Sequence, residues 1–124
     1  VHHLDDLLAD ADIFAPLLPV TDETKGLIDR DRIDSLPDGC LLVLITRAAV
    51  VDMAAVRDRV LDDELALAVD VYDEEPLSPD NPLLGRDNVV HTPHVGGLTE
   101  YSNKQWARML LARFRDSGVS EDPY

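Results

Sequence analysis

Three side chains of this sequence, Arg47, Glu75 and His94, would together suit proton transfer on a small acid. Arginine presents a fixed fork of N–H donors that binds a carboxylate through two hydrogen bonds. Histidine titrates near neutral pH and can donate or accept a proton, and a neighbouring carboxylate fixes its tautomer. The three residues are far apart in the sequence, so this chemistry requires a fold that brings them together.

Each of these residues also has an ordinary structural interpretation. Arg47 could cap a strand or pair with a surface aspartate, and Glu75 could be one more solvated charge. His94 could be a loop histidine that hydrogen-bonds to backbone. The pair Gly96-Gly97 just after His94 favours a site, because glycines let a backbone approach a bulky ligand closely.

Hydrophobic patterning predicts the elements that must position these residues. Continuous or nearly continuous apolar stretches predict strands at 13–18, 40–45, 65–71 and 89–91. Helical spacing predicts helices at 4–10, in 21–36 after the capping residues Thr21 to Thr24, after the cap Asp52, and at 99–116 with Trp106, Met109, Leu110 and Phe114 on its apolar side.

Two of these strands and one loop carry further information. Pro16 inside the 13–18 stretch argues for an irregular or edge position. The unbroken apolar run at 40–45 is typical of a parallel strand covered on both faces. Residues 73–88 are rich in proline and turn-forming residues, which predicts a long irregular loop of the kind that is usually functional.

The alternation of strands and helices predicts an α/β fold with an open parallel sheet and right-handed crossovers. Ligands bind such sheets at the carboxyl ends of the strands. Pro19, Arg47, Asp70 and His94 each follow or end a predicted strand, and Glu75 lies just beyond Asp70. We therefore expect these residues to converge on one crevice.

Three segments also carry a resemblance to a known family. They are Pro19-Val20-Thr21-Asp22-Glu23-Thr24-Lys25-Gly26-Leu27-Ile28, Asp70-Val71-Tyr72-Asp73-Glu74-Glu75-Pro76-Leu77 and Thr92-Pro93-His94-Val95-Gly96-Gly97. In order and approximate spacing they resemble the signature segments of the D-isomer-specific 2-hydroxyacid dehydrogenases, over residues 4 to about 110. The resemblance implies a Rossmann-like domain and hydride transfer between NAD or NADP and a small 2-oxo or 2-hydroxy acid.

The resemblance also implies roles for individual residues. Arg47 would orient the substrate carboxylate, Glu75 would be the partner of the histidine, and His94 would be the general acid/base. The residues that would line the dinucleotide are Leu18, Pro19, Ile45, Thr46, Asp70, Val95, Gly96 and Gly97, with Asp70 beside the nicotinamide.

The sequence departs from the family pattern in ways that affect the site. Where the family usually has Asn-Thr-Ala-Arg-Gly, this chain has Leu44-Ile45-Thr46-Arg47-Ala48. The segment before Asp70, which usually contains a glycine, here contains none. None of the 6 glycines forms the G-x-G-x-x-G turn that holds the dinucleotide pyrophosphate.

The absent turn predicts that residues 1–116 are only the C-terminal portion of a dinucleotide-binding domain, followed by a polar tail at 117–124. The chain would then be incomplete and inactive alone. Its first strand would leave a free edge, which invites pairing with the missing part of the enzyme or with a second copy as a homo-oligomer. A runner-up interpretation is a non-catalytic relative that binds a partner protein through this edge.

The composition excludes some partners. The 124 residues carry 25 acidic side chains and 11 basic ones, a formal net charge of −14, so nucleic acid and anionic membranes are poor partners. Of the acids 19 are aspartate, and only Lys25 and Lys104 are lysines. This surface favours a halophilic protein in a salt-rich cytoplasm over an ordinary acidic mesophilic one.

Two minor features are weak candidates for chemistry. The single cysteine, Cys40, has apolar neighbours and no nearby histidine, which predicts a buried side chain and not a nucleophile. Metal binding through His2, His3 and nearby aspartates is a weak alternative, because adjacent histidines diverge on a strand or helix; we expect no metal site. The start of the chain resembles no signal peptide, which is consistent with a cytoplasmic protein.

Overall fold

The computed structural model describes residues 3–116. The chain divides into two compact units, of which the first ends at His94 and the second begins at Val95. Each unit is described by itself. The predicted polar tail at 117–124 lies outside the described residues.

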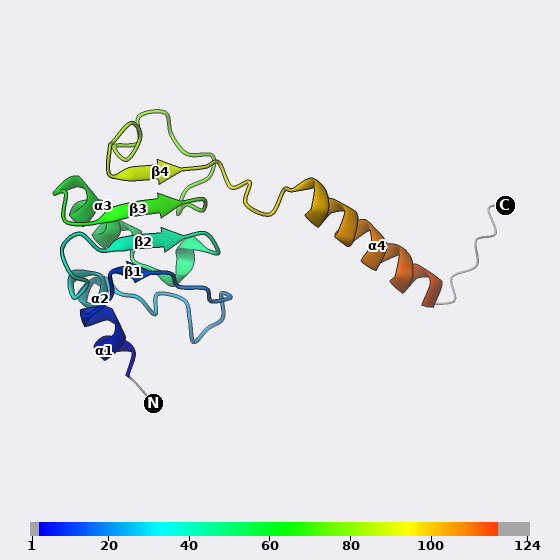
Figure 1. Ribbon diagram of the computed structural model, residues 1–124, viewed down its shortest axis with the longest axis horizontal. Helices are drawn as coiled ribbons and strands as arrows, with labels where there is room; N and C mark the ends of the chain where they lie inside the picture. Colours follow the sequence, from blue (N-terminus) through cyan, green and yellow to red (C-terminus); the bar gives the residue numbers. More distant parts are fainter. Residues whose placement is uncertain (1–2, 117–124) are drawn as a thin grey trace. The chain divides into compact units, whose positions relative to one another are not determined.

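The first unit is built on a parallel sheet of four strands. In sheet order these are β1 (Ile13–Phe14), β2 (Leu41–Leu44), β3 (Ala66–Val69) and β4 (Val89–His91). The strands lie side by side in the order of the sequence (Figure 1), with Leu42 opposite Leu67 and Leu67 opposite Val89. The predicted open parallel α/β sheet is confirmed.

Short helices precede β1 and lie between β1 and β2 and between β2 and β3. They are α1 (Leu4–Ala9), α2 (Arg30–Asp34), the 3₁₀ helix η1 (Ala48–Val50) and α3 (Met53–Leu61). The predicted cap of α3 is confirmed, because an Asp52 carboxylate oxygen accepts a hydrogen bond from the Ala55 N–H at 2.9 Å. Such a cap satisfies a backbone donor that has no partner inside the helix.

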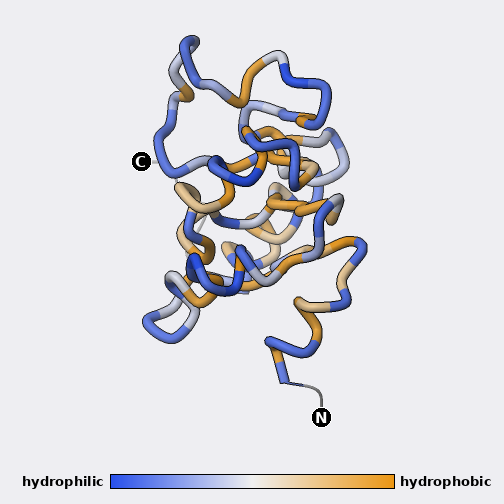
Figure 2. Tube along the Cα trace, turned by 90° about the vertical axis from the view of Figure 1, so that its left-hand side faces the viewer, coloured by the Kyte–Doolittle hydropathy of each residue, from blue (hydrophilic) through white to orange (hydrophobic). Residues whose placement is uncertain are grey.

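The core lies on one face of the sheet. Leu42, Leu44, Leu67 and Val69 are buried, whereas the residues that alternate with them in β2 and β3 are only half-buried. On that second face Val90 of β4 is 71% exposed. Figure 2 shows the hydrophobic segments in the middle of the unit and hydrophilic ones around them. The prediction that the 40–45 strand is covered on both faces therefore holds in full for one face only, and the second face is partly covered in the described residues.

The first predicted strand is much shorter than expected. Strand β1 contains only two residues, and the chain from Ala15 onward makes no ladder with β2 in the described structure. Pro16 has no N–H to donate, which explains why the strand ends before it. Strands β2 and β3 are shorter than predicted by one or two residues at each end, and β4 has the bounds predicted for it.

The predicted helical turns between Thr21 and Leu36 form only in part. Thr21 and Thr24 bond to each other in a turn, and the Thr24 hydroxyl donates to the Pro19 carbonyl at 2.6 Å. Ile28 pairs with Val51 in an isolated parallel bridge. Helix α2 begins later and is capped by Asp29, so the prediction that threonines cap it is wrong.

The segment 73–88 contains no helix or strand, as the sequence predicts. Its Leu83 is buried in the core, and its Asn88 side chain donates to the carbonyls of Val60 and Leu65. The buried state of Cys40 is also confirmed.

The second unit contains α4 (Glu100–Asp116), as predicted for 99–116. All residues on its expected apolar side, Trp106, Met109, Leu110 and Phe114, are exposed. Within residues 3–116, none of the helices combines the length and the apolar character that crossing a bilayer requires.

Candidate functional site

The parallel sheet places the segments that follow β2, β3 and β4 at one edge, the one formed by the carboxyl ends of the strands. The segment after β2 begins at Ile45, Asp70 directly follows β3, and Thr92 directly follows β4. All strands point the same way, so their carboxyl ends share this edge, where open α/β sheets bind ligands.

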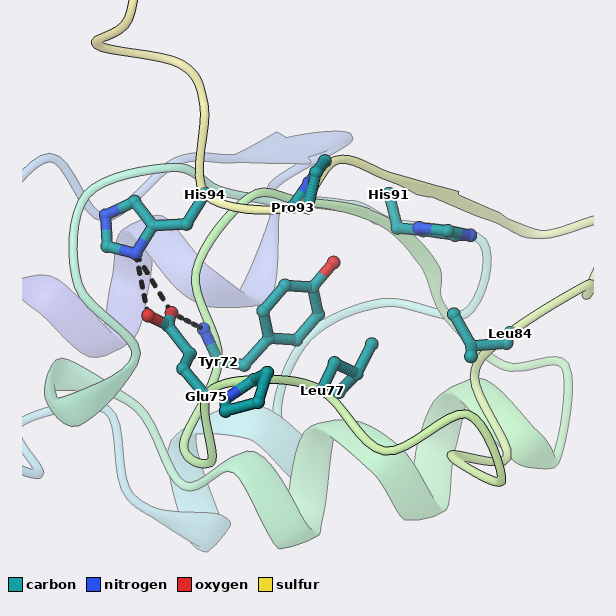
Figure 3. Close-up of a pocket in the computed structure, with 8 residues that line it drawn as sticks. Tyr72, Glu75, Leu77, Leu84, His91, Pro93 and His94 are labelled. Atoms are coloured by element: carbon teal, nitrogen blue, oxygen red, sulfur yellow. Dashed lines mark hydrogen bonds and ion pairs between the residues drawn. The ribbon is translucent and has the colours of Figure 1, made fainter.

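Glu75 and His94 are in contact beside this edge. The Nδ1 atom of His94 lies 2.9 Å from Oε2 and 3.0 Å from Oε1 of Glu75. The side chains are 45% and 39% exposed, so the pair is open to solvent on one side. Figure 3 shows the imidazole facing Glu75 through Nδ1, with its other nitrogen pointing away from the carboxylate. This arrangement leaves that second nitrogen for a ligand.

The backbone of His94 has an uncommon conformation. Its φ is +53°, in the left-handed region that side chains with a Cβ seldom adopt. Such a conformation persists only where surrounding contacts impose it, and it is frequent at functional sites.

The carboxyl group of Glu75 is held in its ionised form. Its pKa is lowered, first by the hydrogen bond with His94 and then by the hydrogen bond that the Tyr72 N–H donates to Oε1. Partial burial and the charge of Asp70 oppose this effect. A carboxylate next to an imidazole fixes which ring nitrogen carries the proton.

A second set of contacts joins the segments that follow β3 and β4. The Tyr72 hydroxyl donates to the Thr92 carbonyl at 3.0 Å, and the Thr92 hydroxyl donates to the buried carboxylate of Asp70. The pKa of the Tyr72 hydroxyl is raised, mainly by burial and further by the charges of Asp70 and Glu75.

Neither contact of Tyr72 follows from the sequence pattern. The only available signal was its position inside the segment between Asp70 and Glu75.

A cavity of about 420 Å³ adjoins the Glu75–His94 pair. Its lining consists of Tyr72, Glu75, Pro76, Leu77, Leu84, His91, Pro93 and His94. Most of this lining is apolar, with the titratable pair at one end (Figure 3). A mostly apolar cavity with a few polar groups is typical of small-molecule sites. His91 was not singled out from the sequence, and its place before Thr92-Pro93 gave no chemical signal.

Arg47 is at the same edge but is not part of the cavity lining. Its guanidinium donates to the carbonyl of Thr46 at 2.6 Å, and the side chain is exposed. The Thr46 hydroxyl in turn donates to the Pro16 carbonyl at 3.0 Å, which ties the segment after β2 to the segment after β1.

The residues expected to line a dinucleotide are distributed over both units. Leu18 packs partly against the core, and Pro19 and Ile45 are exposed near the ends of β1 and β2. Asp70 is buried at the end of β3. Val95, Gly96 and Gly97 belong to the second unit, which is described by itself.

The described residues form neither a metal site nor a reactive thiol. Between residues 3 and 116, no three His, Cys, Asp or Glu side chains gather closely enough to hold a metal ion. The pKa of the Cys40 thiol is raised, mainly by burial, which disfavours the reactive thiolate.

An open parallel sheet with polar groups at its carboxyl edge defines the class of Rossmann-like nucleotide-binding domains. The family profile described as "D-isomer specific 2-hydroxyacid dehydrogenase, NAD binding domain" matches residues 1–96. The chain belongs to this family.

Individual relatives agree with this assignment. The chain is 44% identical over 96 residues to D-3-phosphoglycerate dehydrogenase of Archaeoglobus fulgidus, covering 77% of this chain and 18% of that protein. It is 37% identical over 107 residues to glyoxylate reductase of Aeropyrum pernix, covering 86% of this chain and 32% of that protein. The chain thus spans a third or less of the length of these curated relatives.

Solved structures show the same fold. A D-isomer specific 2-hydroxyacid dehydrogenase from Xanthobacter autotrophicus Py2, solved in complex with NADPH and MES, aligns with a TM-score of 0.69 at 36% identity, covering 74% of this chain and 30% of that one. A glyoxylate reductase from Paecilomyes thermophila aligns with a TM-score of 0.82 at 25% identity, covering 97% of this chain and 37% of that one.

The described residues fit one end of a nicotinamide dinucleotide. A buried carboxylate at the end of β3 and exposed backbone after β1 and β2 are groups that can meet a carboxamide and a ribose. The sequence contains no glycine-rich turn for the pyrophosphate, so that part of the cofactor would be held by other residues.

Proposed function

We propose that this chain is a segment of an oxidoreductase that transfers a hydride between NAD or NADP and a small 2-oxo or 2-hydroxy acid. The observation that carries the proposal is the Glu75–His94 pair beside the carboxyl edge of the sheet. Membership of the dehydrogenase family and the names of the relatives support the same chemistry.

His94 acts as the general acid/base in this proposal. Its nitrogen facing away from Glu75 gives a proton to the carbonyl oxygen during reduction and takes it back during oxidation. Glu75 holds Nδ1 and stabilises the charged imidazole. A bound reduced nicotinamide supplies the hydride to the carbonyl carbon.

Arg47 orients the substrate carboxylate. Its exposed guanidinium is free to rotate away from the Thr46 carbonyl, because a single hydrogen bond of this kind contributes only about 1 kcal/mol. A carboxylate offers the guanidinium two charge-assisted hydrogen bonds in its place.

The cofactor is held jointly by this chain and by residues outside it. Asp70 lies beside the nicotinamide, and Leu18, Pro19, Ile45, Thr46, Val95, Gly96 and Gly97 line the remainder of the dinucleotide in this proposal. The pyrophosphate turn comes from the missing part of the enzyme, so the chain alone is inactive. We place the enzyme in the cytoplasm, in agreement with the single cysteine of this chain, which is buried as a free thiol.

Turnover by an enzyme that contains this chain tests the proposal. NADH and NADPH oxidation is measured with glyoxylate, hydroxypyruvate and pyruvate, and the reverse reaction with 3-phosphoglycerate. We expect His94→Ala to lower kcat by about 10²- to 10⁴-fold, the usual contribution of a general acid or base. Glu75→Gln should lower kcat as well.

The matched control is His3→Ala, which removes an exposed histidine outside the site. It should leave turnover unchanged. Wild-type rates in His94→Ala would reject the acid/base role of His94, and no turnover of any 2-oxo acid by the wild-type enzyme would reject the dehydrogenase proposal.

The open edge of the sheet favours one second candidate, a module that binds a partner chain. In the described sheet β1 pairs only with β2, and Ile13 on β1 is exposed. We propose that this edge pairs with the missing part of the enzyme or with a second copy of the chain. Size-exclusion chromatography of the chain distinguishes these states, and a monomer at high concentration would count against an edge that self-associates.

A further inference from the structure

The hydroxyl of Tyr72 joins the two loops that carry Glu75 and His94. It donates a hydrogen bond of 3.0 Å to the carbonyl of Thr92, two residues before His94. The backbone N–H of the same tyrosine donates to Oε1 of Glu75, also at 3.0 Å. The Glu75 carboxylate contacts His94 Nδ1, so the contacts close a ring that starts and ends at Tyr72.

Within this ring of contacts, Tyr72 is anchored better than Glu75 and His94. Its aromatic ring is partly buried and packs against the core, whereas Glu75 and His94 are both exposed for a large part of their surface. Figure 3 shows the tyrosine ring in the middle of the cavity with its hydroxyl directed toward the Pro93 side. The anchored hydroxyl of Tyr72 thus donates to the segment from Thr92 to His94, which is otherwise exposed to solvent.

Thr92, whose carbonyl accepts the bond from the Tyr72 hydroxyl, is already held by two other hydrogen bonds. Its N–H donates to the Val69 carbonyl at 2.9 Å, and its hydroxyl donates to Asp70. The Tyr72 bond therefore sets the direction of the one remaining polar group of Thr92, its carbonyl. That direction determines how the chain enters the left-handed conformation of His94.

We propose that Tyr72 is a positioning residue, whose hydroxyl holds the segment from Thr92 to His94 so that the imidazole meets the Glu75 carboxylate. This inference rests on the proposed function only for its catalytic consequence. The positioning itself is a property of the chain and can be measured without turnover.

Tyr72→Phe is the direct test, because it removes the hydroxyl and keeps the ring. In an NMR titration of the 124-residue chain, we expect the pKa of Glu75 to rise toward its ordinary value, since His94 would spend less time in contact with it. Tyr101→Phe is the matched control: that tyrosine is 73% exposed on α4, and its variant should leave the Glu75 titration unchanged. An identical Glu75 titration in Tyr72→Phe and wild type would overturn the proposal.

A double-mutant cycle separates positioning from a general structural role. In an enzyme that contains the chain, Tyr72→Phe should lower kcat by about 2- to 10-fold with little change in KM, as expected for loss of one hydrogen bond. In a Glu75→Gln background the same change should have a much smaller effect. Equal losses in both backgrounds would overturn positioning through Glu75.

The two proposals fail in different ways. If the wild-type enzyme turns over no 2-oxo acid, the dehydrogenase proposal fails, while a shifted Glu75 titration in Tyr72→Phe still supports the positioning role. If His94→Ala abolishes turnover and Tyr72→Phe changes neither titration nor kcat, only the positioning role fails.

Discussion

The contact between Glu75 and His94 matters more for the orientation that it gives the imidazole than for the stability that it contributes. Both side chains are substantially exposed, and ion pairs in contact with water contribute little to stability. What the pair provides is a fixed imidazole orientation, supported by Tyr72 on the Glu75 side and by the backbone conformation of His94.

The lowered pKa of Glu75 predicts a pH-dependent contribution to stability. The fold favours the ionised carboxylate, so this contribution is present above the ordinary pKa of 4.5 and is lost as the pH falls through the lower value of the folded chain. We expect the free energies of unfolding of wild type and Glu75→Gln to converge as the pH falls below 4.5. Urea unfolding at a series of pH values measures this.

The neighbouring Glu74→Gln serves as the control, since Glu74 is exposed beside Glu75 in the same loop. Its difference from wild type should not follow the same pH course. A wild-type to Glu75→Gln difference that is independent of pH would contradict the assignment.

For individual residues, the sequence indicated which side chains form the site better than it indicated which contacts they make. Glu75 and His94 could be selected because their segments resemble a family, and the structure places them in contact, while their catalytic roles stay predictions. The Tyr72 hydroxyl bond could not be predicted, because it depends on the register that sets β4 beside β3.

Among the elements, α2 and α3 are held together by one buried arginine. Arg59 of α3 is 8% exposed, and its guanidinium donates to the carbonyls of Ile33 at 2.9 Å and Leu36 at 2.7 Å. It also pairs with Asp38 and Glu64. The last carbonyls of a helix have no partner inside it, so this side chain completes the C-terminal end of α2.

Replacing Arg59 should therefore destabilise the fold strongly. We expect Arg59→Met to lower the free energy of unfolding by about 2–4 kcal/mol, because it removes the charged donor of the Ile33 and Leu36 carbonyls, of which the Ile33 carbonyl still accepts from the Leu36 N–H, and the partner of Asp38 and Glu64. The matched control is Arg57→Met on the same helix, whose guanidinium pairs with the exposed Asp73, and which should cost at most about 1 kcal/mol. Equal losses in the two variants, measured by urea unfolding, would contradict this role.

Helices and strands were predicted well where the hydrophobic pattern is continuous. They were predicted poorly where individual side chains determine where an element begins or ends. Strands β2 and β3 and helices α3 and α4 follow directly from apolar runs and helical spacing. The short β1 and the late start of α2 do not, because Pro16 ends the first ladder and Ile28 pairs with Val51 instead of entering a helix.

The whole molecule is strongly acidic even after its ion pairs are formed. Arg30, Arg32, Arg57, Arg59 and Arg86 each pair with a carboxylate in the described structure. With 25 acidic side chains and a formal net charge of −14, most carboxylates are left to repel one another. Such self-repulsion destabilises a folded state unless counterions screen it.

We expect the chain to be halophilic, with stability that depends on salt. Raising KCl from about 0.01 M to about 1 M shortens the Debye length from about 30 Å to about 3 Å, and the free energy of unfolding should rise over this range. Circular dichroism during thermal unfolding measures this, with sucrose as a control that stabilises without screening charge. Stability that does not change with KCl would identify an ordinary acidic protein.

That the chain is only part of a dinucleotide-binding domain stays a prediction. Without a glycine-rich turn the chain could be interpreted as part of a dinucleotide-binding domain, and it spans a third or less of its curated relatives. The one-sided core was not predictable, because an apolar run looks the same whether the second face is covered or open.

The position of His94 after β4 affects how the site fluctuates. Strand β4 has three residues and pairs only with β3 in the described sheet, whereas β3 is paired on both sides. Native-state hydrogen exchange shows that local opening starts at such weakly held strands and reaches the central strands of a sheet last. We therefore expect the segment that carries His94 to detach more often than the strand that ends before Asp70, so that the proton transfer and the cofactor contact that we propose would be carried by elements of different local stability.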